Sequence, residues 1–174
     1  SSKIMMGEDI RPSGPDGKPT NSTIAKQLEE LGHETMRLKT GTPPRIDIES
    51  IDLTVQVEEP GSDKPIYFSE KEFVNKEYQN IPAWIAHTNE ATHKIINDNI
   101  ERSYLFNDDI TGSGPKYCPS IEDKVKRFHT KDRHQIFLEI ESEHMNTMYL
   151  AGLSSSMPKE VQDEMIASIK GFEN

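Results

Sequence analysis

The chain has 174 residues, about the length of one ordinary domain. It carries 20 Lys and Arg residues against 30 Asp and Glu residues, for a formal net charge of −10. This charge argues against a free-standing nucleic-acid-binding module, whose phosphate contacts need clustered cations, although it leaves room for a local basic patch. The hydrophobic fraction of 33% and the mean hydropathy of −0.73 are low for a compact domain. We therefore expect a small or incomplete core, as in the middle of a larger protein.

Several other protein classes are also excluded. No run approaches the ~18–20 apolar residues of a membrane helix, and residues 1–16 lack the apolar stretch of a signal peptide. Cys118 is the single cysteine, so an internal disulfide is impossible. The six histidines lack the H-E-x-x-H spacing, and no metal site is predicted. We expect a soluble, cytoplasmic protein.

The first forty residues alternate short apolar runs with turn-rich loops. Residues 3–6 are a possible strand, and residues 12–19 are a Pro- and Gly-rich loop. The spacing of Ile24, Leu28 and Leu31 predicts a helix over residues 23–31 with one buried stripe, ended by Gly32. Residues 34–38 are a possible strand.

The middle of the chain is acidic and poor in regular patterns. Pro43-Pro44 imposes an extended path, and residues 47–80 are expected to be irregular and to contain few strands. Residues 81–86 are apolar. A helix is predicted to start at Thr88-Asn89-Glu90, and its inner face is expected to hold Ala91, Ile95 and Asn99 or Ile100.

The last third holds the clearest signals. Residues 111–119 form a second Gly/Pro loop, and Ser120–Asp123 has the capping-box form, which predicts a short helix to about Phe128. Residues 135–140 alternate as a strand does, and residues 154–156 are a serine run typical of a helix cap. A final helix is predicted from the apolar positions Val161, Met165 and Ile169, with Gly171 as its stop.

The loop before the predicted helix at Ser120 is the best candidate for chemistry. Gly112-Ser113-Gly114 gives only G-x-G, which by itself is a weak nucleotide-binding signal. Pro115 and Pro119 restrict the backbone on either side of Cys118, which lies just before a helix N-terminus, where a thiol pKa is lowered. With Lys116 and Lys124 nearby, this loop can hold an anion or activate a thiolate. The alternative is a buried, inert cysteine.

Longer motifs give a resemblance to a known family. The stretch Gly114-Pro115-Lys116-Tyr117-Cys118-Pro119-Ser120-Ile121-Glu122-Asp123-Lys124 resembles a signature of the MnmG (GidA) family of tRNA uridine 5-carboxymethylaminomethyl modification enzymes. Further matches follow in the family's order, at residues 38–45, 87–93, 127–139, 152–158 and 171–174. The resemblance covers nearly the whole chain.

The resemblance implies a fold and a division of the chain. We expect an α/β fold, α+β in isolation, that is the central portion of a glutathione-reductase-like FAD/NAD(P)-binding enzyme with an inserted domain. Residues 1–50 are expected to be part of the FAD-binding domain, residues 51–111 the inserted domain, and residues 112–174 part of the FAD-binding domain with an NAD-contacting loop. Family members are several times longer than 174 residues, and their G-x-G-x-x-G segment for FAD is not found here. The chain is therefore expected to be a middle fragment, inactive by itself.

The resemblance also implies a reaction. The family uses FAD, reduced by NADH, and methylenetetrahydrofolate as the one-carbon donor to modify the wobble uridine of tRNA. It works as a homodimer together with the GTPase MnmE and has no membrane partner. The alternative, from a different class, is a non-catalytic remnant that binds MnmE, MnmG or tRNA.

Site residues follow from the matched positions. The resemblance implies that Cys118 and Lys124 are catalytic. It implies cofactor-binding roles for Asn21, Gly114, Pro115, Lys116, Tyr117, Cys118, Pro119, Ser120, Ile121, Glu122, Asp123, Lys124, Val125, Lys126, Arg127 and Phe128. Asn21 stands where relatives have a flavin-contacting Ser, a role open to Ser22 as well. Lys116 replaces the family's Arg, which removes a fork suited to gripping phosphate.

Overall fold

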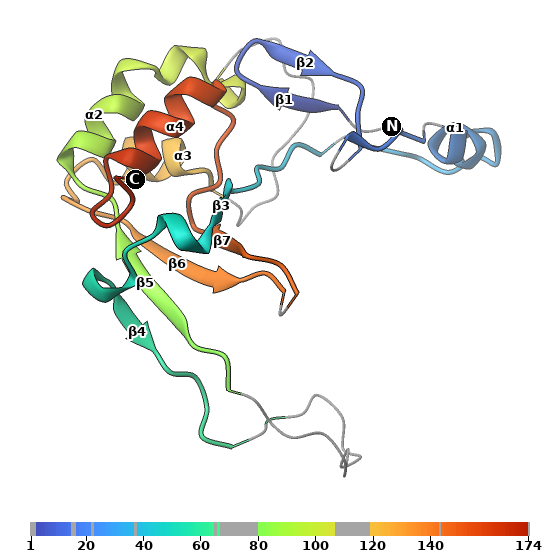
Figure 1. Cartoon of the computed structure of the whole chain (residues 1–174). Coiled ribbons are helices and arrows are strands. Elements are labelled where there is room, and N and C mark those ends of the chain that lie inside the picture. Colours follow the sequence, from blue (N-terminus) through green and yellow to red (C-terminus); the bar gives the residue numbers. More distant parts are fainter. Residues whose placement is uncertain are drawn as a thin grey trace.

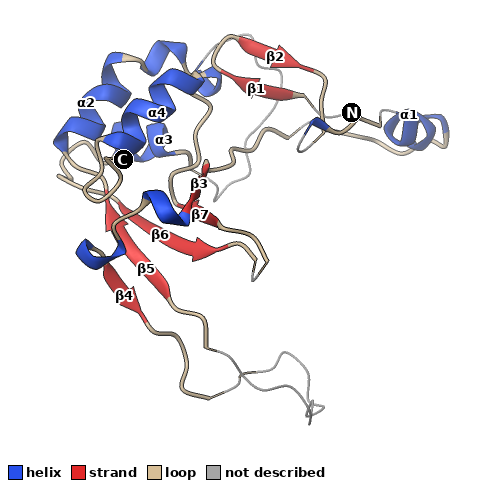
Figure 2. Ribbon diagram, in the orientation of Figure 1, coloured by secondary structure: helices blue, strands red, loops and turns tan. Residues whose placement is uncertain are grey.

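A five-stranded antiparallel sheet covered by helices forms the body of the chain (Figures 1 and 2). The computed structural model describes residues 3–14, 17–21, 23–36, 38–64, 66, 80–106, 119–142 and 144–173. Within these residues the structure is α+β, because the strands pair only antiparallel and three of the α-helices gather on one side of the five-stranded sheet. This confirms the fold class expected for the isolated chain. In the described ranges, no helix combines the length and the apolar content that crossing a bilayer requires.

The sheet has the strand order β3-β7-β6-β5-β4. Its strands are β3 (Arg45–Asp47), β4 (Val57–Glu59), β5 (Ala83–His87), β6 (Gln135–Ile140) and β7 (Thr147–Ala151). Ile136 and Leu138 of β6 are buried, whereas Phe137 between them is exposed, as the two-residue period of a half-buried strand requires. Met148 and Leu150 of β7 continue the same buried face. The strand predicted over residues 135–140 is therefore confirmed.

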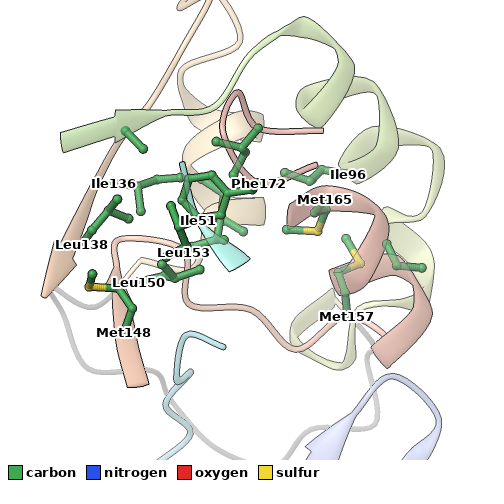
Figure 3. Packing of buried hydrophobic residues seen from close by; sticks show 14 of the residues in the cluster. Ile51, Ile96, Ile136, Leu138, Met148, Leu150, Leu153, Met157, Met165 and Phe172 are labelled. Atoms are coloured by element: carbon green, nitrogen blue, oxygen red, sulfur yellow. The ribbon is translucent and has the colours of Figure 1, made fainter. Parts of the chain in front are cut away.

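Three helices cover this face: α2 (Glu90–Asp98), α3 (Ile121–Arg127) and α4 (Lys159–Ala167). The core lies between them and the sheet, where Ile96, Met165 and Phe172 approach the strand residues (Figure 3). The predicted stripe Val161, Met165 and Ile169 is buried throughout, which confirms the last helix and its inner face.

The first helix forms without the burial expected of it. Helix α1 (Thr23–Glu30) occupies nearly the predicted range, and Gly32 after it has φ +85°. Its stripe is exposed, with Ile24 at 60%, Leu28 at 41% and Leu31 at 76% of their full surface. The prediction of a buried stripe is wrong for the described chain because α1 lies apart from the sheet and the other helices (Figure 1). Periodicity identifies an apolar face but not what covers it.

Helix α2 is rotated relative to its prediction. Its buried residues are Thr92 and Ile96, whereas Ala91 is exposed and Ile95 only partly covered. The cap explains the shift. Asn89 Oδ1 accepts from the Thr92 backbone N at 3.0 Å, and Thr92 Oγ1 lies 2.6 Å from Ser168 Oγ. The buried hydroxyl of Thr92, with Ser168 as its partner, thus takes the inner position that the apolar pattern gave to Ala91.

The remaining elements are short. β1 (Ile4–Met6), which was predicted, pairs with β2 (Asp9–Arg11), which was not. Residues 34–36 form no strand, contrary to expectation. The region 47–80, expected to contain few strands, contributes the edge strand β4 as well as 3-10 helices at residues 48–50 and 53–55. The sheet contains strands from all three expected domains. β3 comes from residues 1–50 and pairs with β7, and β5 comes from residues 51–111 and pairs with β4 on one side and β6 on the other. The domain division itself stays a prediction.

Candidate functional site

The start of α3 is tied to a loop that lies about 35 residues later in the chain. Ser120 Oγ accepts from the backbone N of Asp123 at 3.1 Å, which is the N-cap that the sequence predicts. The backbone N of Ile121 donates to the Ser154 carbonyl at 2.8 Å. The helix ends at Arg127, as expected, with acidic residues in its first turn and basic residues in its last. The position of α3 therefore depends on the loop of residues 152–157.

A fully buried carboxyl group stands at the centre of this junction. Glu122, in the first turn of α3, has no exposed surface. Its Oε1 accepts from Ser155 Oγ at 2.8 Å, from Ser103 Oγ at 3.1 Å and from the Ser156 backbone N at 3.1 Å. Its Oε2 is also buried but has no hydrogen-bond partner within the described part of the chain. Among the described residues, Oε1 therefore accepts all the hydrogen bonds of this carboxyl group.

The serines that donate to Glu122 also make hydrogen bonds with one another and with the nearby backbone. Ser103 Oγ lies 2.9 Å from Ser156 Oγ, which also accepts from the Leu105 backbone N at 3.0 Å. Ser155 Oγ accepts from the Met157 backbone N at 3.0 Å. These bonds join three chain segments around one carboxyl group.

The serine run is thus not the helix cap that the sequence pattern predicts. Pro158 takes the N-cap position of α4 and makes no side-chain cap hydrogen bond there. Ser155 and Ser156 instead donate to Glu122, because a buried carboxyl group is costly unless donors surround it. Sequence reasoning missed this pairing since the partners are more than thirty residues apart. The available signal was an unusual density of hydroxyl groups.

Lys124 lies on the other side of α3. Its side chain is half-buried, and Nζ donates to the Gly152 carbonyl at 2.9 Å. Burial lowers the pKa of the Lys124 ammonium group. No carboxylate pairs with it among the described residues. Gly152 permits this approach, because with φ +99° a Cβ there would lie 3.0 Å from the Gln135 carbonyl and 3.3 Å from Lys124 Nζ.

Two histidines meet at the corner between β5 and α2. Thr88 Oγ1 lies 2.8 Å from His93 Nε2 and accepts from the His134 backbone N at 2.8 Å. The two imidazole rings lie 5.1 Å apart. The pKa of His134 is lowered by burial first and by the nearby His93, Lys124 and Lys131 next. In the ranges that the structure describes, no group of three or more His, Cys, Asp or Glu residues could hold a metal ion.

The structure covers only part of the predicted site. Residues 114–118, including Cys118, lie outside the described residues. Residues 119–128 form the turn into α3 and α3 itself, which brings Ser120, Glu122 and Lys124 together on one short helix. Asn21 is exposed, and its Oδ1 accepts from the Thr23 backbone N at 2.9 Å at the start of α1, far from α3 (Figure 1). The cofactor-binding and catalytic roles stay predictions.

Comparisons with known proteins agree along the whole chain. The sequence model of the family described as glucose inhibited division protein A (GidA) matches residues 1–174. The tRNA uridine 5-carboxymethylaminomethyl modification enzyme MnmG of Malacoplasma penetrans is 47% identical over 175 residues, which are 99% of this chain and 28% of that protein. The protein of the same name from Lachnoclostridium phytofermentans is 46% identical over 178 residues, which are 100% of this chain and 28% of that protein.

A solved structure has the same fold. GidA from Aquifex aeolicus, in its form I crystal, matches with a TM-score of 0.85 at 40% identity, over 99% of this chain and 30% of that one. This chain therefore spans less than a third of the length of the relatives that it matches. The expected resemblance is confirmed by sequence and by fold, and the chain belongs to the glucose inhibited division protein A (GidA) family.

Proposed function

We propose that the protein containing this chain is a tRNA uridine 5-carboxymethylaminomethyl modification enzyme. The observation that carries this proposal is the 46–47% identity to MnmG proteins over 99–100% of the chain. The chain covers 28% of those proteins, so the other segments of such an enzyme supply the FAD-binding G-x-G-x-x-G turn. The flavin, reduced by NADH, supplies the redox chemistry. The one-carbon unit comes from methylenetetrahydrofolate, and the enzyme acts in the cytoplasm as a homodimer with the GTPase MnmE.

Within this enzyme, we propose that residues 114–128 contact the NAD(H). The described part of this segment, residues 119–128, fits an anionic ligand at Lys124. Its ammonium group is half-buried, lacks a carboxylate partner in the described part of the chain, and uses one of its three N–H donors on Gly152. A phosphate group would supply the missing negative charge.

The residues of this chain then have separate tasks. Glu122 and its three serine partners hold α3 in place, and α3 in turn orients Lys124. Cys118, two residues before the Ser120 cap, is proposed to act as a thiolate favoured by the adjacent helix N-terminus. The serine network around Glu122 fixes the first turn of α3, which follows the Ser120 cap.

The activity is tested with the full-length protein, loaded with FAD and supplied with MnmE, GTP, NADH, methylenetetrahydrofolate, an amine donor and unmodified tRNA. Mass spectrometry of the digested tRNA should detect a carboxymethylaminomethyl group on uridine. Cys118→Ser should reduce turnover per flavin-loaded enzyme while the melting temperature stays the same. A flavin-loaded protein that modifies no uridine would refute the proposal and favour a non-catalytic interaction module.

The role of Lys124 has a separate, non-catalytic test. Lys124→Gln should weaken NADH binding, measured by the change in NADH fluorescence on titration with the protein. Lys159→Gln, which removes an exposed lysine of α4, is the matched control. Equal NADH affinity in the two variants would remove Lys124 from the proposed site without affecting the proposed reaction.

A further inference from the structure

The connection from α3 to β6 carries a concentration of positive charge that the Glu122 network does not use. Residues 124–134 contain five Lys or Arg residues and one acidic residue, Asp132, although the whole chain has a net charge of −10. Lys124 turns inward to Gly152. The other four cations, on residues 126, 127, 131 and 133, are exposed. We call residues 126–133 the basic turn.

Little within the described chain neutralises the basic turn. Arg127 Nε lies 4.0 Å from Asp123 Oδ1, a long contact between exposed groups that contributes little. Lys126 Nζ lies 4.7 Å above the Phe106 ring. Among the described residues, Lys131 and Arg133 have no carboxylate within ion-pair distance. The basic turn therefore presents unpaired cations to solvent.

The helix dipole accounts for the positions of only two of these four cations. Lys126 and Arg127 lie in the last turn of α3, where positive charge complements the helix dipole. Lys131 and Arg133 lie beyond the helix, where that stabilisation has faded. Both cations lie near histidines. Burial is the main cause that lowers the pKa of His134 and of His87, and Lys131 lowers the pKa of His134 further, as Arg133 does that of His87. The described fold gives neither of these two cations a carboxylate partner, so both are available to an external anion.

An exposed aromatic ring lies among the cations. Phe128, at the C-cap of α3, is 53% exposed, and its ring centroid lies 6.4 Å from that of His134. An exposed aromatic ring between Lys and Arg residues suits a single-stranded nucleic acid, whose phosphates bind the cations while an unpaired base stacks on the ring. An acidic protein would satisfy the charges but would leave the ring without a comparable partner.

The basic turn is held in a fixed shape. Within it, the Lys131 backbone N donates to the Phe128 carbonyl at 2.8 Å, and just beyond it the His134 carbonyl accepts from the Thr88 backbone N at 2.9 Å. In Figure 1 this connection runs along the outer edge of the helical layer, beside the start of α2. A surface that is ordered before binding loses less conformational entropy when its ligand arrives.

We propose that the basic turn is an RNA-contacting surface. Arg127, Lys131 and Arg133 bind the phosphate backbone, and Phe128 stacks on an unpaired base. The identity of the RNA as tRNA rests on the proposed function. Residues 126–128 of this surface also belong to the segment proposed to contact NAD(H), whereas Lys131 and Arg133 lie outside that segment.

The test measures the affinity of the full-length protein for a labelled, unmodified tRNA as a function of salt concentration. Lys131→Gln combined with Arg133→Gln should weaken binding on the order of tenfold at low salt and make the slope of log K against log [salt] shallower by about 1 to 2. The matched control is Lys94→Gln with Lys159→Gln, which removes the same charge from two exposed lysines that already pair with Asp98 and Asp163. Phe128→Ala should weaken binding without changing the slope, because stacking releases no counterions.

Each result has a definite meaning. Weaker tRNA binding by the Lys131/Arg133 variant, with near wild-type tRNA binding by the control variant, would support the proposal. Unchanged binding in the first variant, or an equal loss in both, would overturn it, and wild-type uridine modification in the same samples would leave the proposed function standing. Competition by poly-glutamate as strong as by RNA would show a site for acidic protein instead. A wild-type protein that binds no tRNA would overturn this proposal and the proposed function together.

Discussion

Replacing the buried carboxyl group of Glu122 tests how the start of α3 is held. In Glu122→Ala, the Ser155 hydroxyl and the Ser156 backbone N–H lose their acceptor, whereas the Ser103 hydroxyl keeps the Ser156 hydroxyl as a partner at 2.9 Å. Each buried donor left without an acceptor costs about 1–3 kcal/mol, so the two should destabilise the protein by about 2–6 kcal/mol.

Glu122→Gln should behave differently because only one of the two carboxyl oxygens makes hydrogen bonds. An amide oxygen in the place of Oε1 keeps all three acceptor contacts, and the amide nitrogen replaces Oε2, which has no partner among the described residues. One unpaired buried polar group thus replaces another, and the change should cost about 1–2 kcal/mol, mainly through weaker acceptance by the amide.

Urea denaturation of both variants and the wild type at one pH measures the two free-energy differences. The ratio between them is the informative quantity, since both variants alter the same buried position. If Glu122→Gln destabilised the protein as much as Glu122→Ala, the three bonds to Oε1 would not be what holds the junction. A cost below about 0.5 kcal/mol for Glu122→Ala would refute the reasoning as well, because that is the range of surface substitutions.

Three further results are expected. Gly152→Ala should cost about 1–3 kcal/mol of folding free energy, since it puts a Cβ 3.0 Å from the Gln135 carbonyl at φ +99°, and an unchanged melting temperature would contradict this. The folded-state pKa of His134 lies below its ordinary 6.5, so below about pH 6.5 the unfolded chain binds more protons than the folded chain. The free energy of unfolding should therefore fall as the pH falls through this range. Denaturation at pH 7.5 and pH 5.5 should show a smaller difference for His134→Gln than for the wild type. In this chain by itself, Met165→Ala should cost about 2–5 kcal/mol and Leu28→Ala less than about 0.5 kcal/mol, because Met165 is buried and Leu28 is exposed, and equal unfolding midpoints would refute the contrast.

The sequence determined the elements whose signals are local. The range of α3 follows from the cap at Ser120 and the basic last turn, and β6 follows from the alternation of residues 135–140. The buried face of α4 follows from Val161 and Met165, one helical turn apart, and Ile169 just after the helix continues it. In each case the deciding interactions lie within a few residues, so the pattern of the chain contains them. The family, too, was evident from colinear motifs, and the match over residues 1–174 confirms it.

The tertiary structure alone decided which of these patterns are covered and which polar groups meet. The apolar stripe of α1 is as regular as that of α4, but it is exposed because no described element packs on it. The carboxyl group of Glu122 and the hydroxyl groups of Ser103 and Ser155 come from segments up to 52 residues apart and are neighbours only after the helices pack on the sheet. A buried carboxyl group needs hydrogen-bond donors, and these can come from any part of the chain that the fold brings near it. The local sequence around Glu122 therefore does not identify the serines that donate to it.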